Sequence, residues 1–394
     1  MTTALSPAPP TGPVPDATPA PGVDGPSLAA ARPDRADLDP GHALGELARW
    51  RREDAAADRF PYRAVLGHYR AVGKNAVGEE LLTALRAVEP HGPAGAVDPA
   101  AQLLADWLPQ VVDGQQGDYD SYLGTPVYTS LTAAGAGPDQ VITALLAEVV
   151  ATEAAVLAGN PAGLPRTRAA LRALAAAAGI PALIPGESED LVAACAEAVA
   201  VARQAVPAGV LRAVELTLTP TTRGHDEQMF IRVIQIFEAV FAAVGRAVAG
   251  ATEAVAAGRA DLARDLLAEA VRQLAGTSGV FRVLTTMPKD AFAVIRANTD
   301  GRSAVQSRSY RGVERSCPTL HLALLESGLP QEELQPVMAE LDEAWGAMKR
   351  THWGITMKII GSVPGTGGTA GAAYLREAAE ARLFPALRRA QPAG

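Results

Sequence analysis

The sequence has little cysteine, few aromatic residues and no excess of basic charge, and each shortage excludes a class of protein. Two cysteines in 394 residues, Cys195 and Cys317, support neither a disulfide framework nor a cysteine-based zinc site. Aromatic residues make up 5% of the chain while alanine is abundant, which favours a helical protein over an all-β one. A net charge of −8 argues against a nucleic-acid surface, which is built from clustered Lys and Arg. A small neutral or zwitterionic ligand is the more natural partner.

Long hydrophobic runs are also missing. No uninterrupted apolar stretch approaches the roughly 18 residues that a membrane-spanning helix needs, so no membrane partner is expected. The first residues lack the basic and then apolar pattern of a secretory signal peptide. With so little cysteine, these features predict a cytoplasmic protein. Exposed and core-facing apolar helix faces look alike in sequence, so a homo-oligomer is left open.

The chain divides into three parts by composition and periodicity. Residues 1–40 are rich in Pro, Ala, Gly and Asp without a periodic apolar pattern, which is typical of a disordered tail. Residues 41–215 carry helical patterns separated by Gly- and Pro-containing breaks, and predict an N-terminal helical domain. Residues 216–394 carry further helical patterns and predict a second domain, which would contain the functional site.

Three segments are expected to interrupt the helices. Val214, Leu216 and Leu218 alternate with polar residues, as in a short strand or an extended connector, and the domain boundary is placed near them. The polar run at residues 113–128 predicts a loop, and so does the stretch at residues 299–312. Each segment precedes a strongly periodic helix.

One histidine lies on the apolar stripe of a predicted helix near the C-terminus. The residues of this stripe recur at steps of three and four: Leu341, Trp345, Met348, His352, Ile355 and Ile359. Gly361 ends the pattern. On this pattern alone the histidine is either a core side chain or a metal ligand. No second histidine stands at helical spacing, so zinc hydrolysis is not predicted, whereas a haem needs only one axial imidazole because the macrocycle supplies four ligands.

A glycine-rich loop follows this helix directly. Gly365, Thr366 and Gly367 begin the run GTGGTAG, which offers backbone N–H groups at little steric cost. Such a loop suits an anion or a closely packed substrate. It lacks the lysine of a P-loop, and as an isolated motif it is equally compatible with a tight turn.

A second candidate cluster contains an aromatic ring and a guanidinium. Arg296 follows Phe292 by four residues, so both share one helical face. The pair is either a surface arginine lying over a ring or a bidentate clamp for a substrate carboxylate beside an aromatic wall. The adjacent His225, Asp226 and Glu227 point to different sides of a helix, and we interpret them as helix N-terminal residues rather than as metal ligands.

Four blocks of the chain, in order, resemble the histidine-ligated haem dioxygenase superfamily, which includes tryptophan 2,3-dioxygenase, indoleamine 2,3-dioxygenase and a pyrrolnitrin-biosynthesis enzyme. The resemblance covers about residues 220–388, and the combined spacing is more specific than any one block. The blocks are HDEQMFIRVIQIFE at 225–238, FAVIRANTDGRSAVQS at 292–307, THWGITMKIIG at 351–361 and GTGGTAGAAYLREAAEARLFPAL at 365–387.

The resemblance implies an all-α fold, in which a helical bundle that binds haem b follows a smaller helical N-terminal domain. It implies that His352 is the proximal iron ligand and that Arg296 grips the substrate carboxylate. Thr366 would meet the substrate ammonium and a haem propionate, within a cofactor-binding loop that includes Gly365 and Gly367. The remaining residues that it assigns to the substrate pocket are Phe230 and Phe292 as aromatic walls and Ser303, Ala304 and Val305 as distal lining.

One departure bears on the reaction. The position at which tryptophan dioxygenases carry a distal histidine is Ile234, so no imidazole can bond a substrate N–H or bound oxygen, and no catalytic residue is assigned. The resemblance implies a haem-dependent oxygenase that inserts oxygen from O2 into an L-amino acid, tryptophan or an indole derivative first, in secondary metabolism. The alternatives are a haem monooxygenase that hydroxylates tyrosine or arginine, and a non-catalytic haem-binding sensor or helical interaction protein.

Overall fold

The computed structural model describes residues 35–90, 98–112, 119–133, 136–157, 161–181, 188–299, 307–359, 361, 372–385 and 387. Within these ranges all regular secondary structure is helical, which confirms the all-α class. The α-helices are α1 Arg35–Leu38, α2 Pro40–Arg52, α3 Tyr62–Val72, α4 Glu79–Arg86, α5 Pro99–Val112, α6 Tyr119–Leu123, α7 Thr125–Ala133, α8 Pro138–Leu157, α9 Leu164–Ala178, α10 Ser188–Gln204, α11 Ala208–Leu216, α12 His225–Ala256, α13 Ala260–Leu284, α14 Lys289–Asn298, α15 Arg308–Glu326, α16 Gln335–Ile359 and α17 Ala372–Glu380. Short 3-10 turns are η1 Ala57–Arg59, η2 Lys74–Ala76, η3 Pro161–Gly163 and η5 Gln331–Glu333.

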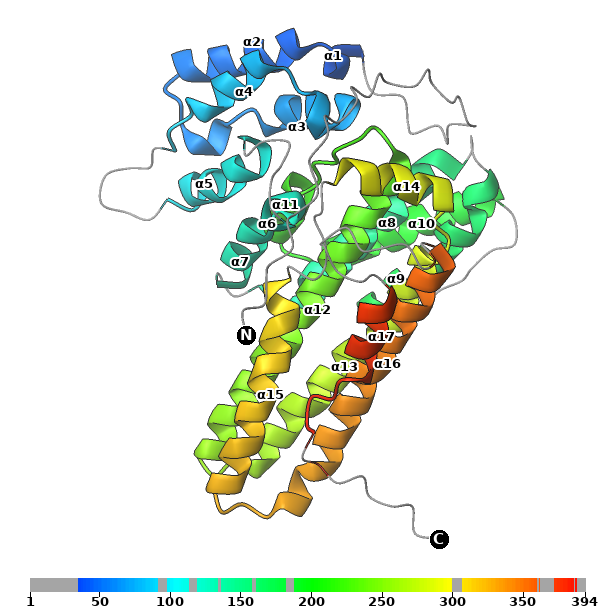
Figure 1. Cartoon of the computed structure of the whole chain (residues 1–394). Coiled ribbons are helices and arrows are strands. Elements are labelled where there is room, and N and C mark those ends of the chain that lie inside the picture. Colours follow the sequence, from blue (N-terminus) through cyan, green and yellow to red (C-terminus); the bar gives the residue numbers. More distant parts are fainter. Residues whose placement is uncertain are drawn as a thin grey trace, which may run out of the picture.

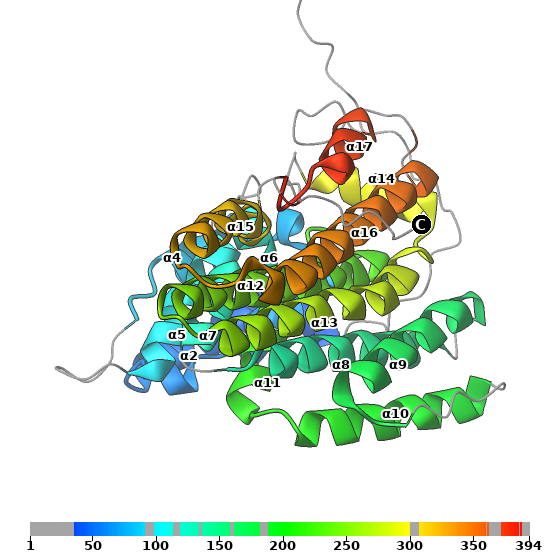
Figure 2. The same cartoon turned by 90° about the horizontal axis from the view of Figure 1, so that it is seen from below.

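A long bundle of α12, α13, α15 and α16 forms the main body (Figure 1). The centre of this body is α12, a helix of 32 residues that packs against α13, α15 and α8. Apolar side chains surround α12 on several faces, because a helix that contacts neighbours on most sides loses the usual polar stripe. Seen from below, α8, α9 and α10 form a further layer on one side of the bundle (Figure 2).

Two hydrophobic cores account for most of the burial. The larger core runs from α8 through the bundle to Leu387, and the smaller core lies among α2–α5 at one end of the bundle (Figure 1). Edge-to-face rings fill the smaller core, with Phe60 5.1 Å from Trp50 and 5.6 Å from Trp107 between ring centroids. Helices α8–α10 therefore share a core with the later bundle. The domain boundary expected at residues 215 and 216 stays a prediction.

The expectation of a strand or extended connector is wrong for Val214 and Leu216, whereas Leu218 lies in the non-helical connector between α11 and α12. Val214 and Leu216 belong to α11, a helix of nine residues. Val214 packs in the larger core, while Ala213 and Leu216 pack in the smaller one. Because both faces of this short helix are covered, its apolar residues lack the single stripe of a surface helix, and the resulting alternation resembles a strand.

Part of the expected loop at 113–128 is also helical. Residues 119–123 form α6 and α7 begins at Thr125. The two tyrosines of α6 are buried, because each hydroxyl reaches a buried carboxylate. Tyr119 donates to Glu238 over 2.7 Å, and Tyr122 donates to Glu227 over 3.1 Å. Residues 113–118 lie outside the described ranges.

Two other expected boundaries shift for similar reasons. Residues 35–38, expected in the disordered tail, form α1, which docks on α3 where the Nδ1 atom of His68 lies 2.9 Å from the carbonyl oxygen of Asp37. Residues 1–34 lie outside the described part of the chain. The expected loop at 299–312 ends early, because Ser307 caps α15 by accepting a hydrogen bond from the Tyr310 N–H over 3.0 Å.

Among the described helices, two are long and apolar enough to cross a membrane by length and composition alone, or up to three if the bent pair Asp190–Gln204 and Ala208–Leu216 counts as one span. The two single helices are α8 and α12, and most of the apolar window of each is buried by the other helices. Both helices belong to the larger core, so their hydrophobicity has a packing explanation. The cytoplasmic location stays a prediction.

Candidate functional site

The histidine-bearing helix, α16, has the apolar face that its sequence period predicts. Leu341 and Trp345 are fully buried, and Met348 and Ile355 are nearly so. His352 lies on the same face and is half-buried, near the end of the helix. The imidazole is therefore held at the border of the core rather than in its centre.

The surroundings of His352 are apolar. The ring of Phe281 on α13 stacks against the imidazole with a centroid distance of 6.5 Å and an interplanar angle of 26°. Among the described residues no hydrogen bond joins either ring nitrogen of His352 to a partner. Burial lowers the pKa of the imidazole, because a charged ring would lose its hydration. The ring is thus neutral near pH 7, which is the form that binds a metal ion.

A chain of aromatic contacts continues from Phe281 into the bundle. Phe237 on α12 lies 4.6 Å from Phe281 and 6.1 Å from Phe241 between ring centroids. Phe241 in turn contacts Trp345 of α16 at 5.5 Å. These rings fix the spacing of α12, α13 and α16 around the histidine, because close-packed rings tolerate little displacement.

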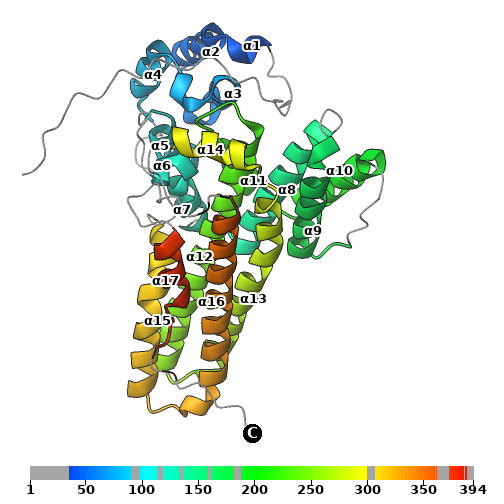
Figure 3. The ribbon, with the colours of Figure 1, turned by 45° about the vertical axis from the view of Figure 1, so that its right-hand side comes forward.

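The two phenylalanines assigned to the aromatic walls do meet. Phe230 on α12 and Phe292 on α14 pack edge to face, with centroids 5.6 Å apart and planes at 73°, and both are half-buried. Phe230 precedes Phe237 by two helical turns, which is about 10 Å along the axis of α12. Helix α14 crosses the same end of the bundle at which α16 ends (Figure 3). The ring pair and His352 therefore belong to one end of the bundle.

Arg296 lies on α14 and Ile234 lies on α12. Arg296 stands one turn after Phe292 on α14, is half-buried and takes part in polar interactions of its own. Ile234 is half-buried and packs against a small cluster that includes Tyr119 and Leu218. The α12 wall is thus apolar at the position that carries histidine in tryptophan dioxygenases.

The remaining assignments cannot be compared with the structure. They lie outside the described residues, and they are Ser303, Ala304, Val305, Gly365, Thr366 and Gly367. Described residues lie on both sides of the glycine-rich segment. Gly361 closes α16 with a φ of +74°, and beyond α17 the buried Asp342 of α16 accepts a hydrogen bond from the N–H of Leu383 over 2.7 Å.

The beginning of α12 contains a buried ionic network that sequence reasoning treated as helix-end residues. Arg166 of α9 donates to Asp226 over 2.6 Å and lies 3.5 Å from Glu153 of α8. His225 Nε2 lies 3.1 Å from the same Glu153 carboxylate. Glu227 accepts hydrogen bonds from the backbone N–H groups just before the helix. All are buried and hydrogen-bonded or ion-paired, and the pairs of Arg166 and Glu153 join α8, α9 and α12.

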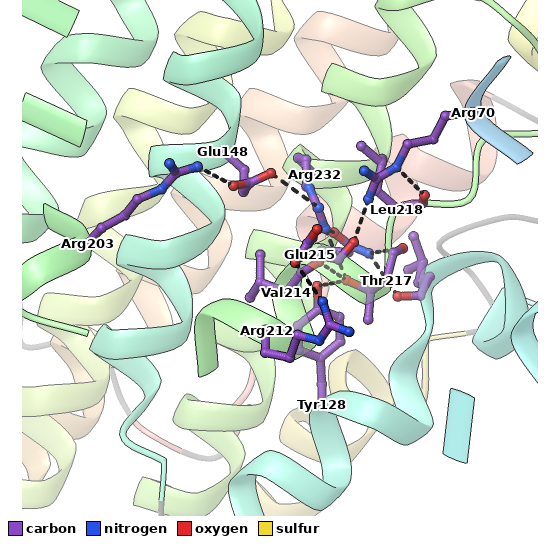
Figure 4. Close-up of polar contacts among 12 residues, drawn as sticks. Arg70, Tyr128, Glu148, Arg203, Arg212, Val214, Glu215, Thr217, Leu218 and Arg232 are labelled. Carbon is purple, nitrogen blue, oxygen red and sulfur yellow. Dashed lines mark hydrogen bonds and ion pairs between the residues drawn. The ribbon is translucent and has the colours of Figure 1, made fainter. Parts of the chain in front are cut away.

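A second polar network joins α3, α8, α11 and α12 (Figure 4). Arg70 donates to the carbonyl oxygens of Glu215 and Leu218, over 2.6 Å and 3.2 Å. Arg232 donates to the Thr217 hydroxyl over 3.0 Å and lies 3.8 Å from the Glu148 carboxylate. Burial, and then the positive charge of Arg232, lower the pKa of Arg70 to about 10. Both guanidinium groups bind residues at the C-terminus of α11, where the helix dipole favours a positive charge.

Sequence reasoning missed one carboxyl group close to the predicted site. Glu238 is buried on α12, one turn beyond Ile234, and burial raises its pKa. A glutamate within a long apolar helix was the available signal, because such a side chain is rarely buried without partners. Its partners, Tyr119 and Ser307, come from α6 and from the start of α15.

The donor set suits a haem better than a free metal ion. Within the described ranges no group of three or more His, Cys, Asp or Glu side chains could hold a metal ion. A haem needs one axial ligand from the chain, and the half-buried neutral imidazole of His352 beside the ring of Phe281 fits that role. No protein-family model matches the chain, and no curated protein shows significant sequence similarity to it.

Proposed function

We propose that this protein is a haem-dependent oxygenase that inserts oxygen from O2 into an L-amino acid, with tryptophan or an indole derivative as the first substrate class. The observation that carries the proposal is the environment of His352. Its neutral imidazole has no described hydrogen-bond partner and lies against Phe281 on an apolar face. The side chain is half-buried rather than enclosed, and a neutral imidazole whose ring nitrogens have no partner among the described residues can bind a metal ion.

The four sequence blocks add a second line of support. They resemble the haem dioxygenase superfamily, and two residues that this resemblance assigns to one pocket, Phe230 and Phe292, lie in contact although 62 positions separate them. Neither fact depends on the other. The finer architecture, a haem domain of the tryptophan dioxygenase type preceded by a smaller helical domain, belongs to the same proposal.

Each residue has a definite task in this proposal. His352 holds haem iron, and the haem supplies the site of O2 binding and activation. Phe230 and Phe292 hold the flat side chain of the substrate and exclude water. Arg296 binds the substrate carboxylate, and Thr366 binds the ammonium. Because Ile234 offers no proton, the wall of α12 facing the substrate positions the reactants rather than acting as acid or base.

The first experiment tests haem ligation. The purified chain is reconstituted with haem, and the Soret band is compared between the wild type, His352→Ala and His42→Ala, a control at an exposed position. We expect the band to be lost or strongly shifted only in His352→Ala. A wild-type protein that shows no Soret band after reconstitution would rule out the oxygenase and the haem-sensor alternative together.

The second experiment identifies the reaction. Amino acids are screened anaerobically for a change in the haem spectrum, O2 is then admitted, and the product is analysed by mass spectrometry. Gain of two oxygen atoms indicates dioxygenation, and gain of one indicates hydroxylation of an amino acid such as tyrosine or arginine. Haem binding without a spectral response to any amino acid would favour a sensor over an enzyme.

A further inference from the structure

A buried carboxyl group stands beside the proposed site and has no role in it so far. Glu238 lies on α12 one turn after Ile234 and two turns after Phe230, so the three share a face. Its side chain is buried, and one oxygen accepts a hydrogen bond from the Tyr119 hydroxyl over 2.7 Å. The hydroxyls of Ser307 and Ser309 also hydrogen-bond to it. A single carboxyl thus gathers groups from three elements: α6, α12 and α15.

Through Ser307 this carboxyl fixes the start of α15. The Ser307 oxygen accepts the Tyr310 N–H over 3.0 Å as the helix N-cap, while its hydroxyl bonds to Glu238. Loss of an N-cap typically weakens the first turn of a helix, because the free N–H groups lose their partner. The position of Tyr310 therefore depends on Glu238.

Tyr310 links this cap to the helix that carries the histidine. Its ring stacks on Trp345 of α16, with centroids 5.0 Å apart and an interplanar angle of 27°, and contacts Phe241 of α12 at 5.4 Å. Trp345 is fully buried and precedes His352 by two turns on the same face of α16. A continuous set of contacts therefore runs from Glu238 through Ser307 and Tyr310 to α16, the helix that carries His352.

The charges around Glu238 favour its protonated form. Asp120 on α6 brings a like charge, and it is paired in turn with the exposed Arg308 of α15 at 3.5 Å. Burial is the largest cause that raises the pKa of Glu238, whereas the three hydroxyl partners lower it. Helices α13 and α16 also pack near Glu238. They contribute the uncharged rings of Phe281 and Trp345, which contact Phe237 and Phe241 on the adjoining turns of α12.

We propose that Glu238 is a positioning residue that holds α6 and the N-terminus of α15 against α12 while its carboxyl is protonated. Through Tyr310 and Trp345 it thereby keeps α16, the helix that carries His352, in its position. Its effect on ligand binding rests on the proposed function, whereas its effect on helix packing does not. When the carboxyl ionises, a buried negative charge faces Asp120, and the cost of burying this charge exceeds the gain from the stronger hydrogen bonds that the three hydroxyls donate to a carboxylate.

The test compares Glu238→Gln, Glu238→Ala and the wild type, with Glu253→Gln as a control at an exposed position of the same helix. Glutamine is neutral at every pH and keeps a similar shape. Because the pKa of Glu238 is raised on folding, the wild type should lose stability as pH rises through that pKa, and Glu238→Gln should not. Equal pH dependence of the urea midpoint in the wild type and Glu238→Gln would overturn the proposal.

Hydrogen exchange locates the effect. Peptides covering α6 and the first turns of α15 should lose protection in Glu238→Ala at all pH values, and in the wild type only at pH values above the raised pKa of Glu238. They should stay protected in Glu238→Gln and follow the wild type in Glu253→Gln. Uniform exchange across the four proteins at these peptides contradicts the packing role, whatever the protein binds.

The haem-loaded protein tests the link to the site. With L-tryptophan as the probe, the apparent affinity read from the Soret shift should fall with rising pH in the wild type, by at most about tenfold per pH unit for one linked proton. It should stay flat in Glu238→Gln. An identical pH profile in both proteins overturns the role at the site. Absence of any Soret band or tryptophan response instead refutes the proposed function, and leaves the exchange and stability results to decide the packing role.

Discussion

At the scale of single residues, burial controls the protonation of the His352 imidazole. Its ordinary pKa of 6.5 is lowered in the folded chain, so between the two values the unfolded chain binds more protons. The stability that this neutral ring contributes is present above pH 6.5 and is lost as pH falls below it. We expect the free energy of unfolding of the haem-free protein to fall less steeply with decreasing pH in His352→Leu than in the wild type. Urea midpoints measured from neutral to mildly acid pH test this, and identical slopes would contradict it.

The ring pair of Phe230 and Phe292 gives a second prediction at this scale. An edge-to-face pair at 5.6 Å contributes about 0.5–1.5 kcal/mol beyond its buried area. In the proposed oxygenase, Phe292→Ala should weaken amino-acid binding by roughly tenfold and leave the Soret band of the haem complex unchanged. Val294→Ala, at an exposed position of the same helix, is the control. Equal affinities in the two variants would remove Phe292 from the substrate wall.

At the scale of elements, the start of α12 is held by buried charges. Arg166 compensates Asp226 and Glu153, so Arg166→Ala leaves two buried carboxylates without their cation. Such a loss costs about 3–5 kcal/mol. Arg264→Ala removes an exposed arginine from its pair with Asp261 and should cost less than about 1 kcal/mol. Urea unfolding measures both, and similar losses in the two variants would show that the buried network is not needed for folding.

At the scale of the whole molecule, a glycine after α3 lies against the backbone of the segment that leads into α12. Gly73 has a φ of +86°, and a Cβ placed on it would lie 2.7 Å from the backbone oxygen of Thr221. The next residue, Lys74, donates its N–H to the Pro220 carbonyl over 2.8 Å. The smaller core is thereby joined by backbone contacts to the segment that leads into α12.

Gly73→Ala should therefore lower the free energy of unfolding by more than the cost of the left-handed backbone conformation, because the added Cβ also meets the Thr221 oxygen. Gly179, which ends α9 at a φ of +65°, has open space around it, so Gly179→Ala should cost only the about 1–2 kcal/mol of a left-handed residue. The extra loss in Gly73→Ala measures the close approach of Gly73 to the backbone of residues 221 and 222. Urea unfolding of both variants makes the comparison, and equal losses would mean that the 220–222 segment shifts at no cost.

The sequence by itself determined the helical class and the face of α16 that carries His352, because the period of apolar residues along a helix is a local property. It also indicated that Phe230, Phe292 and Arg296 form one group, through resemblance to a family. Other features were decided only by the tertiary structure, because they depend on residues far apart in the chain. Glu238 and Tyr119 are separated by 119 positions, and α11 reads as a strand until both cores cover it. Tertiary packing alone can tell whether a polar side chain in an apolar helix has found a buried partner.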